Sequence, residues 1–311
     1  MDIALEHRDA ALVALGRHLK ARGYRFTTVT PATHARVNAR PDNKIASTLE
    51  DIFGWSRPFS PDVLPEDMAG ALRDGGAMAP HGNLCRSTVR FSTLERQIFM
   101  HSAFPTDTAD AVFFGPDTYR FANALRTTFR EAGDGQAMTI VDIGCGTGAG
   151  GLYLQSLLSG PVHQILGDIN PAAIRFARIN AVLNGCEARA VRSDIMSDIS
   201  ESADIIIVDQ QMVKASHSLE AATKEAVLME IDRVVNFFQT RYNKKVNQCL
   251  LVGGRATEKE TRDFLTSKLR LPMKVGDPFA RIQYPSSLER ILKEELGPPL
   301  AVAVGLAMRE D

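Results

Sequence analysis

The chain has 311 residues, of which 44% are hydrophobic and 23% are charged, a composition typical of a globular protein with a sizeable core. Its formal net charge of −1 gives no overall electrostatic reason to expect a nucleic-acid partner, although a local basic face is not excluded. No run of about 18 apolar residues predicts a membrane span. Asp2, Glu6 and His7 are atypical of a secretory leader, so we expect a cytoplasmic protein.

The four cysteines, Cys85, Cys145, Cys186 and Cys249, are widely separated. They form no CxxC pair, and no histidine lies at metal-ligand spacing from them. We therefore expect reduced thiols and no metal site.

The first 115 residues are predicted to form a small α+β domain. Residues 3–22 carry apolar side chains at helical spacing, and Gly23 ends that pattern. Residues 24–82 are interrupted by proline and glycine, with short helical pieces such as residues 43–55. The stretches "CRSTVRFSTL", "QIFMHSAF" and "DAVFFGP" are rich in Thr, Val and Phe and are predicted to be β-structure.

Residues 116–212 alternate between helical and strand patterns. A helix is expected over 116–133, and further helices are expected over 150–160 and 171–185. Apolar strands are predicted at 138–144, 163–169, 188–194 and 203–210. This alternation predicts an α/β fold, with a Rossmann-like parallel sheet and helices on both faces.

The last part, residues 213–311, carries a third series of elements. An amphipathic helix is expected over 225–242, and a strand entering a glycine turn over 246–254. A helix over 257–271, a short strand over 272–279 and a C-terminal apolar stretch over 298–311 follow. This segment either completes the sheet or forms a separate lobe.

The stretch "VDIGCGTGAG" is the strongest ligand-binding pattern in the chain. Glycines at 144, 146 and 148 allow a tight turn from strand to helix and a close approach of the backbone to a ligand. Gly144, Gly146 and Ala149 fit the dinucleotide pattern loosely. The pattern D-x-G-x-G-x-G, counted from Asp142, fits better. An acid at that place suits the ammonium of S-adenosylmethionine rather than a pyrophosphate.

Two later carboxylates follow strands of the same predicted sheet. Asp168 ends the second strand, at the edge where ligands bind in parallel sheets, and it could accept hydrogen bonds from two ribose hydroxyls. Enzymes that bind NAD place an acid similarly. Asp194 follows the third strand and could accept from an adenine amine, or it could cap a turn.

The ordered segments "VDIGCGTGAGG", "GDINPAAIRFARINAVLNG" and "RSDI" resemble those of class I S-adenosylmethionine-dependent methyltransferases. The group they resemble is the small-domain methyltransferases, which includes the N-methyltransferases of ribosomal RNA guanine and of release-factor glutamine. The resemblance covers about residues 85–212. It implies S-adenosyl-L-methionine as cofactor, bound by Asp142, Gly144, Cys145, Gly146, Thr147, Gly148, Asp168, Ile169, Asp194, Ile195 and Thr118. Pro116 and Asp117 lie beside Thr118 in a segment that closes over the cofactor in that group.

The pattern departs from that group after the fourth strand. The group carries Asn-Pro-Pro-Tyr there, which holds a planar nitrogen of the acceptor, whereas this chain has Asp209, Gln210, Gln211 and Met212. Asp209 and Gln210 are the candidate catalytic residues, and Asp209 can still accept a hydrogen bond. We expect transfer of a methyl group to a nitrogen acceptor on RNA, protein or a small molecule.

Residues 225–310 are similar to the C-terminal part of the actin-like ATPases of type IV pilus assembly. The similarity lies in Gly253 and Gly254, in "PMKVGDPF" and in "AVAVGLAMR". It implies an alternative, an interaction protein with an impaired methyltransferase core and a pilus or filament-type partner. An NAD-dependent oxidoreductase is a third alternative.

Overall fold

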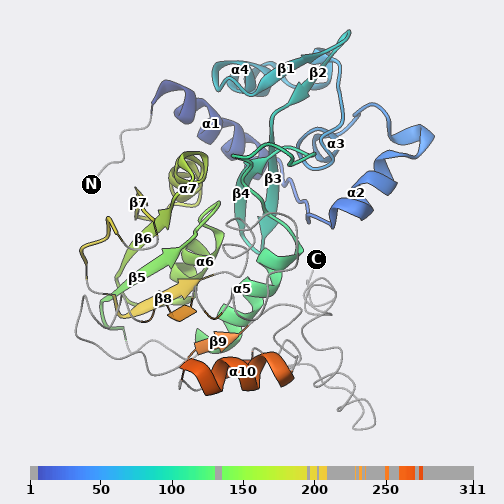
Figure 1. The fold of residues 1–311 in the computed structure, drawn as a ribbon. Helices are drawn as coiled ribbons and strands as arrows, with labels where there is room; N and C mark the ends of the chain where they lie inside the picture. Colours follow the sequence, from blue (N-terminus) through green and yellow to red (C-terminus); the bar gives the residue numbers. More distant parts are fainter. Residues whose placement is uncertain are drawn as a thin grey trace.

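A computed structural model describes the fold of the chain (Figure 1). It describes residues 6–129, 135–194, 197–201, 203–208, 249–251, 259–269 and 273–275, together with Leu228, Ile231, Asp232 and Val235.

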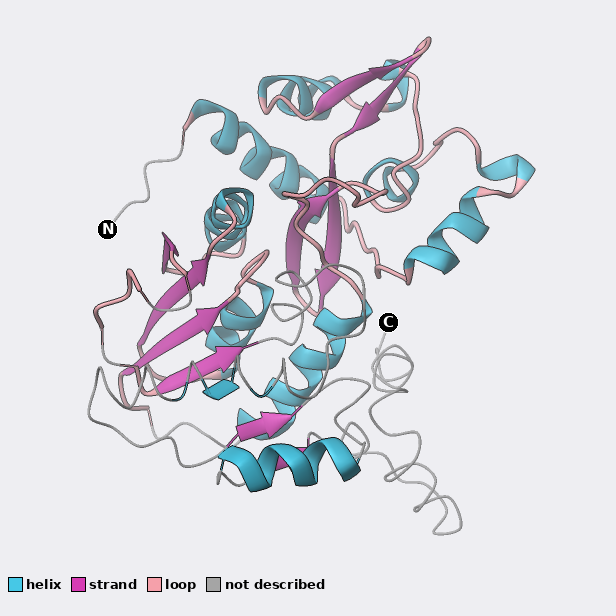
Figure 2. Cartoon of the chain, in the orientation of Figure 1, coloured by secondary structure: helices cyan, strands magenta, loops and turns pink. Residues whose placement is uncertain are grey.

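The N-terminal part combines helices with two antiparallel hairpins. The apolar positions of the first helix, Leu12, Leu15 and Leu19, are all buried, as their spacing predicts. The hairpins stand apart from the parallel sheet (Figure 2). The elements are α1 (His7–Ala21), α2 (Pro31–Asn38), η1 (Pro41–Asn43), α3 (Leu49–Phe53), η2 (Pro61–Val63), α4 (Glu66–Asp74), β1 (Met78–His81), β2 (Leu84–Ser87), β3 (Val89–Leu94) and β4 (Gln97–Ser102).

The central part contains a four-stranded parallel sheet in the order β7-β6-β5-β8. In this order the first two strands of the sheet, β5 and β6, are neighbours, and the fourth lies on the other side of β5. The carboxyl end of β5 is therefore the topological switch point, where open α/β sheets bind ligands. The elements are α5 (Pro116–Phe129), β5 (Met138–Ile143), α6 (Ala149–Leu157), β6 (Val162–Asp168), α7 (Pro171–Leu183), β7 (Ala188–Arg192) and β8 (Ile205–Val208).

Both faces of this sheet are buried. Ile140 on β5 joins a core cluster with Phe121 of α5 and Leu154 of α6. Leu166 on β6 joins another cluster with residues of α6 and α7. Val141 and Ile165 alternate with these residues and are fully buried as well. Their burial is typical of a parallel sheet that is covered on both faces.

The elements predicted for the N-terminal and central parts are confirmed to within a few residues, with one exception. The stretch "DAVFFGP" is not a strand but an extended loop, which is held to the end of β4. Ser102 N–H donates to Val112 O at 3.1 Å, and Val112 N–H donates to Ser102 Oγ at 2.9 Å. The stretch ends in glycine and proline. Because proline has no backbone N–H to donate, the pairing does not continue into a longer ladder.

The C-terminal region contributes β9 (Cys249–Leu251), α10 (Lys259–Leu269) and β10 (Met273–Val275). The strands β9 and β10 pair in parallel and form a two-stranded sheet. Most of the helix expected over 225–242 and the stretch 298–311 lie outside the described residues. Within the described part of the chain, every helix is too short or too polar to cross a membrane.

Candidate cofactor-binding site

The glycine loop between β5 and α6 has three residues with positive φ: Gly144 (+68°), Gly146 (+54°) and Gly148 (+77°). Two of them need glycine for different reasons. A Cβ added to Gly148 would meet Leu166, Leu152 and Ala177 at 3.2–3.4 Å, so this residue faces the core. A Cβ added to Gly146 would meet no atom within 4 Å, so this residue faces open space. Gly146 is therefore the point of the loop at which a ligand can approach the backbone.

Asp168 holds this loop against the end of the neighbouring strand. Its Oδ2 accepts from Gly146 N–H at 2.9 Å, and its Oδ1 accepts from Asn170 N–H at 2.8 Å. Each carboxylate oxygen can accept more than one hydrogen bond, so both oxygens keep acceptor capacity for ligand hydroxyls. The structure thus brings together the two parts of the predicted site that the sequence separates by 22 residues.

Asp142 lies near the end of β5, directly before the glycine loop. Its side chain is buried, and its Oδ2 accepts from Gly151 N–H at 2.8 Å. A Cβ at Gly150 or Gly151 would lie about 3 Å from the same oxygen. The carboxylate therefore lies under the first turn of α6, where it offsets the positive end of the helix and fixes the loop. A direct contact with a cofactor stays a prediction.

Cys145 and Thr147 alternate with the glycines, and both side chains are buried rather than turned to the open space. Cys145 belongs to the core cluster formed by α6 and α7. Burial, and next the charges of Asp142 and Asp168, raise the pKa of its thiol well above the usual value. Cys145 N–H donates to Gly167 O at 3.0 Å, and its thiol donates weakly to Gly146 O at 3.9 Å, so the residue helps to hold the loop.

Ile169 and Asp194 lie at the same edge of the sheet. Ile169 is 61% exposed, although large apolar side chains are normally covered. An apolar surface beside Asp168 would fit the flat face of an adenine. Asp194 is exposed just after β7, and Ser197 N–H donates to its backbone oxygen at 3.1 Å, which is typical of a turn. Ile195 lies outside the described residues.

Thr118 lies in the first turn of α5, where its hydroxyl accepts from Gly115 N–H at 3.3 Å. Asp117 forms an ion pair with Arg120 at 2.8 Å. The loop before this helix reaches the cofactor edge, because Asn170 Nδ2 donates to Asp110 O at 3.0 Å. The predicted covering segment therefore lies near Asp168 in space, while the Thr118 side chain serves the start of its own helix.

Asn180 of α7 and Asn184, the C-cap of that helix, connect this site to the N-terminal part, and the sequence did not single them out. Asn180 is fully buried and pairs with both backbone groups of Met100 on β4, at 2.7 and 2.9 Å. Its Nδ2 also donates to Thr147 O in the glycine loop, at 2.9 Å. Asn184 pairs in the same way with Ile98, at 3.0 and 2.9 Å. Their four-residue spacing on an apolar helix was the available signal.

The candidate catalytic residues Asp209 and Gln210 lie outside the described residues. The strand that leads to them, β8, is paired with β5 in register Ile143↔Val208. In the sheet order, β8 lies on the side of β5 opposite to β6, the strand that ends at Asp168. Among the described residues, no group of three or more metal-ligating side chains is present.

Residues 134–262 match the family described as "Methyltransferase domain". The chain is 37% identical over 68 residues to a ribosomal RNA small subunit methyltransferase C of Hamiltonella defensa, covering 22% of this chain and 20% of that protein. It is 35% identical over 103 residues to an uncharacterized RNA methyltransferase of Caldanaerobacter subterraneus, covering 31% and 22%. The chain thus spans about a fifth of the length of these curated relatives.

A solved structure, a 16S rRNA N2 methyltransferase of T. thermophilus in complex with AdoMet and guanosine, is similar at 13% identity and a TM-score of 0.36. The alignment covers 64% of this chain and 53% of that one. The family match and the sheet order confirm the predicted α/β fold of a class I methyltransferase. Residues 134–262 are similar to a methyltransferase domain, and S-adenosylmethionine is the cofactor that this match and the glycine loop support.

Proposed function

We propose that the protein is an S-adenosylmethionine-dependent methyltransferase that acts on a nitrogen atom of an RNA base. The observation that carries this proposal is the joining of the glycine loop to Asp168 at the switch point of the sheet. The open space at Gly146 and the exposed side chain of Ile169 fit the same cofactor.

When bound, S-adenosylmethionine supplies an electrophilic methyl group. The residues of this chain have to hold the two reactants in line and exclude water. Asp168 would accept from the ribose hydroxyls, and the backbone at Gly146 would border the methionine part. Asp142 would keep the loop in shape from below. Little acid–base chemistry is needed when a nitrogen lone pair already points at the methyl group.

RNA as the acceptor is supported by the names of the relatives, a ribosomal RNA methyltransferase and an RNA methyltransferase. Those proteins are several times longer than the matched stretch, so their substrates come to this chain only as a proposal. A cytoplasmic location, expected from the sequence, belongs to the same proposal.

The acceptor nitrogen would be held by Asp209 and Gln210, with Asp209 accepting from it. Replacing Gln210, Gln211 and Met212 by Pro, Pro and Tyr gives Asp-Pro-Pro-Tyr. This sequence differs from the Asn-Pro-Pro-Tyr of the small-domain group only at Asp209. This variant is expected to raise methyl transfer, because an aromatic ring would then stack on the acceptor. Methyl transfer to ribosomal RNA from labelled S-adenosylmethionine measures the effect.

The first test is calorimetric titration of the full chain with S-adenosylhomocysteine. Asp168→Ala is expected to weaken binding tenfold or more, about 1.4 kcal/mol, because it removes the acceptor for the ribose hydroxyls. An exposed substitution, Glu66→Ala, is the control and should leave binding unchanged. A folded protein that does not bind S-adenosylhomocysteine would refute the proposed activity.

The two alternatives give different results in these tests. An interaction protein with a pilus or filament-type partner predicts no gain of methyl transfer in the Pro-Pro-Tyr variant, whatever the acceptor. An NAD-dependent oxidoreductase predicts binding of the nicotinamide cofactor and none of S-adenosylhomocysteine. The family match extends to residue 262 and includes β9, which supports continuation of the methyltransferase domain into the tail.

A further inference from the structure

Arg90 on β3 is a buried arginine with unused hydrogen-bond donors. The residue is only 3% exposed. Its Nε and Nη2 atoms are buried and have no hydrogen-bond partner. Among the residues that the structure describes, Arg90 forms no ion pair, and the groups that act on its pKa are the tyrosines Tyr24 and Tyr119. Burial lowers the pKa of Arg90 to about 10, which reflects an uncompensated charge.

The two unpaired nitrogens lie on one edge of the guanidinium group. Nε–H and the adjacent Nη2–H point in nearly the same direction and form the fork that binds a carboxylate or a phosphate through two parallel hydrogen bonds. Buried donors without partners are rare in folded proteins, and a missing water or ion is a common reason for them. The unpaired edge of Arg90 therefore indicates a place for an oxyanion.

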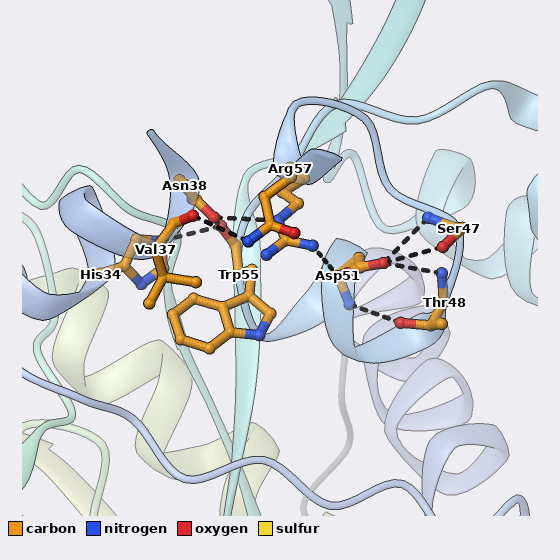
Figure 3. Close-up of polar contacts among 9 residues, drawn as sticks. His34, Val37, Asn38, Ser47, Thr48, Asp51, Trp55 and Arg57 are labelled. Carbon is orange, nitrogen blue, oxygen red and sulfur yellow. Dashed lines mark hydrogen bonds and ion pairs between the residues drawn. The ribbon is translucent and has the colours of Figure 1, made fainter. Parts of the chain in front are cut away.

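Arg57 provides an internal comparison, because it is a second buried arginine in the same part of the chain (Figure 3). Its Nε donates to Asn38 Oδ1 at 3.0 Å, and its Nη1 is paired with Asp51. Each of the two guanidinium groups lies 5.6 Å from the centre of an aromatic ring, Arg57 over Trp55 and Arg90 over Phe26. The two arginines thus differ in their polar partners: Arg57 has a carboxylate and an amide oxygen, and Arg90 Nε and Nη2 have none among the described residues.

Among the described residues, two histidines near Arg90 are without charge. The pKa of His34 is lowered to about 4, and that of His101 is lowered well below its usual value, in both cases by burial and then by the charge of Arg90. Both rings are therefore neutral near pH 7. His34 Nε2–H donates a hydrogen bond to Trp55 O at 2.9 Å, and His34 Nδ1 is buried without a partner. Nδ1 is then an acceptor that a hydroxyl of a ligand could use.

We propose that Arg90 and His34 form a binding site for a phosphate-type oxyanion, with the Nε–Nη2 edge of Arg90 as the donor and His34 Nδ1 as an acceptor. The ligand class is the phosphate of a nucleotide or free phosphate. The identification of the nucleotide with part of an RNA acceptor rests on the proposed function, whereas the oxyanion site itself does not.

The position of the site relative to the covering segment fits a substrate contact. Arg90 pairs with His101 across the hairpin, and the ring of His101 stacks on Phe114 at 5.4 Å. Phe114 in turn contacts Tyr119 in the first turn of α5, beside Thr118. An anion bound at Arg90 would thus be close to the segment that leads to the cofactor edge.

Thermal unfolding and calorimetry of the full chain test the proposal with Arg90→Met and Arg57→Met as matched variants. Phosphate, compared with chloride at the same ionic strength, is expected to raise the unfolding temperature of the wild type and of Arg57→Met but not that of Arg90→Met. Calorimetric binding of phosphate should be at least tenfold weaker in Arg90→Met. Without phosphate, Arg90→Met should unfold at or above the wild-type temperature, whereas Arg57→Met should unfold at a lower one because it strands Asp51.

Guanosine 5′-monophosphate and guanosine distinguish the source of the oxyanion. Tighter binding of the monophosphate than of inorganic phosphate, lost in Arg90→Met, identifies a nucleotide site. Equal affinities identify a site for free phosphate. No effect of either anion on the wild type, or the same effect in Arg90→Met, would overturn the proposal. Titration of Arg90→Met with S-adenosylhomocysteine, expected to be unchanged, separates this result from a failure of the methyltransferase assignment.

Discussion

Two sets of buried polar side chains in the molecule differ in whether they have hydrogen-bond partners. Around the glycine loop, Asp142 accepts from Gly151 N–H, and Asn180 forms three hydrogen bonds to Met100 and Thr147. In the N-terminal part, Arg90 on β3 and His34 on α2 leave buried nitrogen atoms without partners.

The difference distinguishes buried polar groups that hold the backbone in place from buried polar groups that are available to bind a ligand. A buried polar group with all its partners stabilises a given backbone geometry, and its removal strands the partner groups. A buried donor without a partner costs free energy in the ligand-free protein. Such a cost is accepted where a ligand supplies the partner, as natural proteins tend to be less stable at functional sites.

Asn180→Leu removes the hydrogen bonds of a fully paired buried side chain, and we expect it to have the largest effect. The change keeps the branching of the side chain, with a somewhat larger volume, but strands Met100 N–H, Met100 O and Thr147 O. We expect the free energy of unfolding to fall by about 3 kcal/mol. Urea unfolding measures the loss, and titration with S-adenosylhomocysteine should show weaker binding because Thr147 belongs to the loop.

Asn184→Leu is the matched control for that variant. It strands the two backbone groups of Ile98 and touches no residue of the loop, while its third partner, Asn180 O, keeps the bond from the backbone N–H of residue 184. A loss of about 2 kcal/mol with unchanged cofactor binding is expected. Equal effects of both variants on binding would contradict a loop-positioning role for Asn180.

The glycine loop sharpens the comparison between core-facing and ligand-facing positions. Gly148→Ala places a methyl group among Leu166, Leu152 and Ala177 at a positive φ, and we expect it to reduce stability by about 2 kcal/mol. Gly146→Ala has the same type of backbone strain without the crowding, and should reduce stability by about 1 kcal/mol. Its affinity for S-adenosylhomocysteine should fall tenfold or more, because the methyl group enters the open space.

Thermal unfolding and titration of the two alanine variants give both quantities. A Gly146→Ala protein that binds the ligand like the wild type would place the ligand elsewhere.

The smallest expected effect is a pH dependence of the free energy of unfolding, which comes from the imidazole of His34 with its unpaired Nδ1. The pKa of His34 is about 4 in the folded state, below its ordinary value of 6.5. The unfolded state therefore takes up the proton first as the pH falls. The contribution of His34 to the free energy of unfolding should be constant above pH 6.5. Between pH 6.5 and 4 the protonation of His34 in the unfolded state should lower the free energy of unfolding progressively.

His34→Gln can still donate to Trp55 O and should flatten this part of the stability curve, as measured by urea unfolding at several pH values. His101 titrates in the same direction and is present in both proteins, so the difference between the two curves isolates His34. Parallel curves would show that His34 is not buried as a neutral group.

The sequence alone determined the elements of the central domain and the local part of the site. Period-2 and period-3.6 patterns, the glycines at positive φ and the acid at the end of β6 are properties of short stretches. The positions of Asp142 and Cys145 were not accessible in this way. Strand alternation places both near the loop, but only the packing of α6 and α7 on the sheet decides which side chain is buried.

The tertiary structure alone decided the contacts between distant parts of the chain. Asn180 meets Met100 across 80 residues, and the pairing of Arg57 and the lack of a partner at Arg90 follow from how the N-terminal elements pack together. Both arginines look alike in the sequence. The physical reason is that hydrogen bonding and desolvation depend on which groups share a buried volume, and no local pattern encodes this.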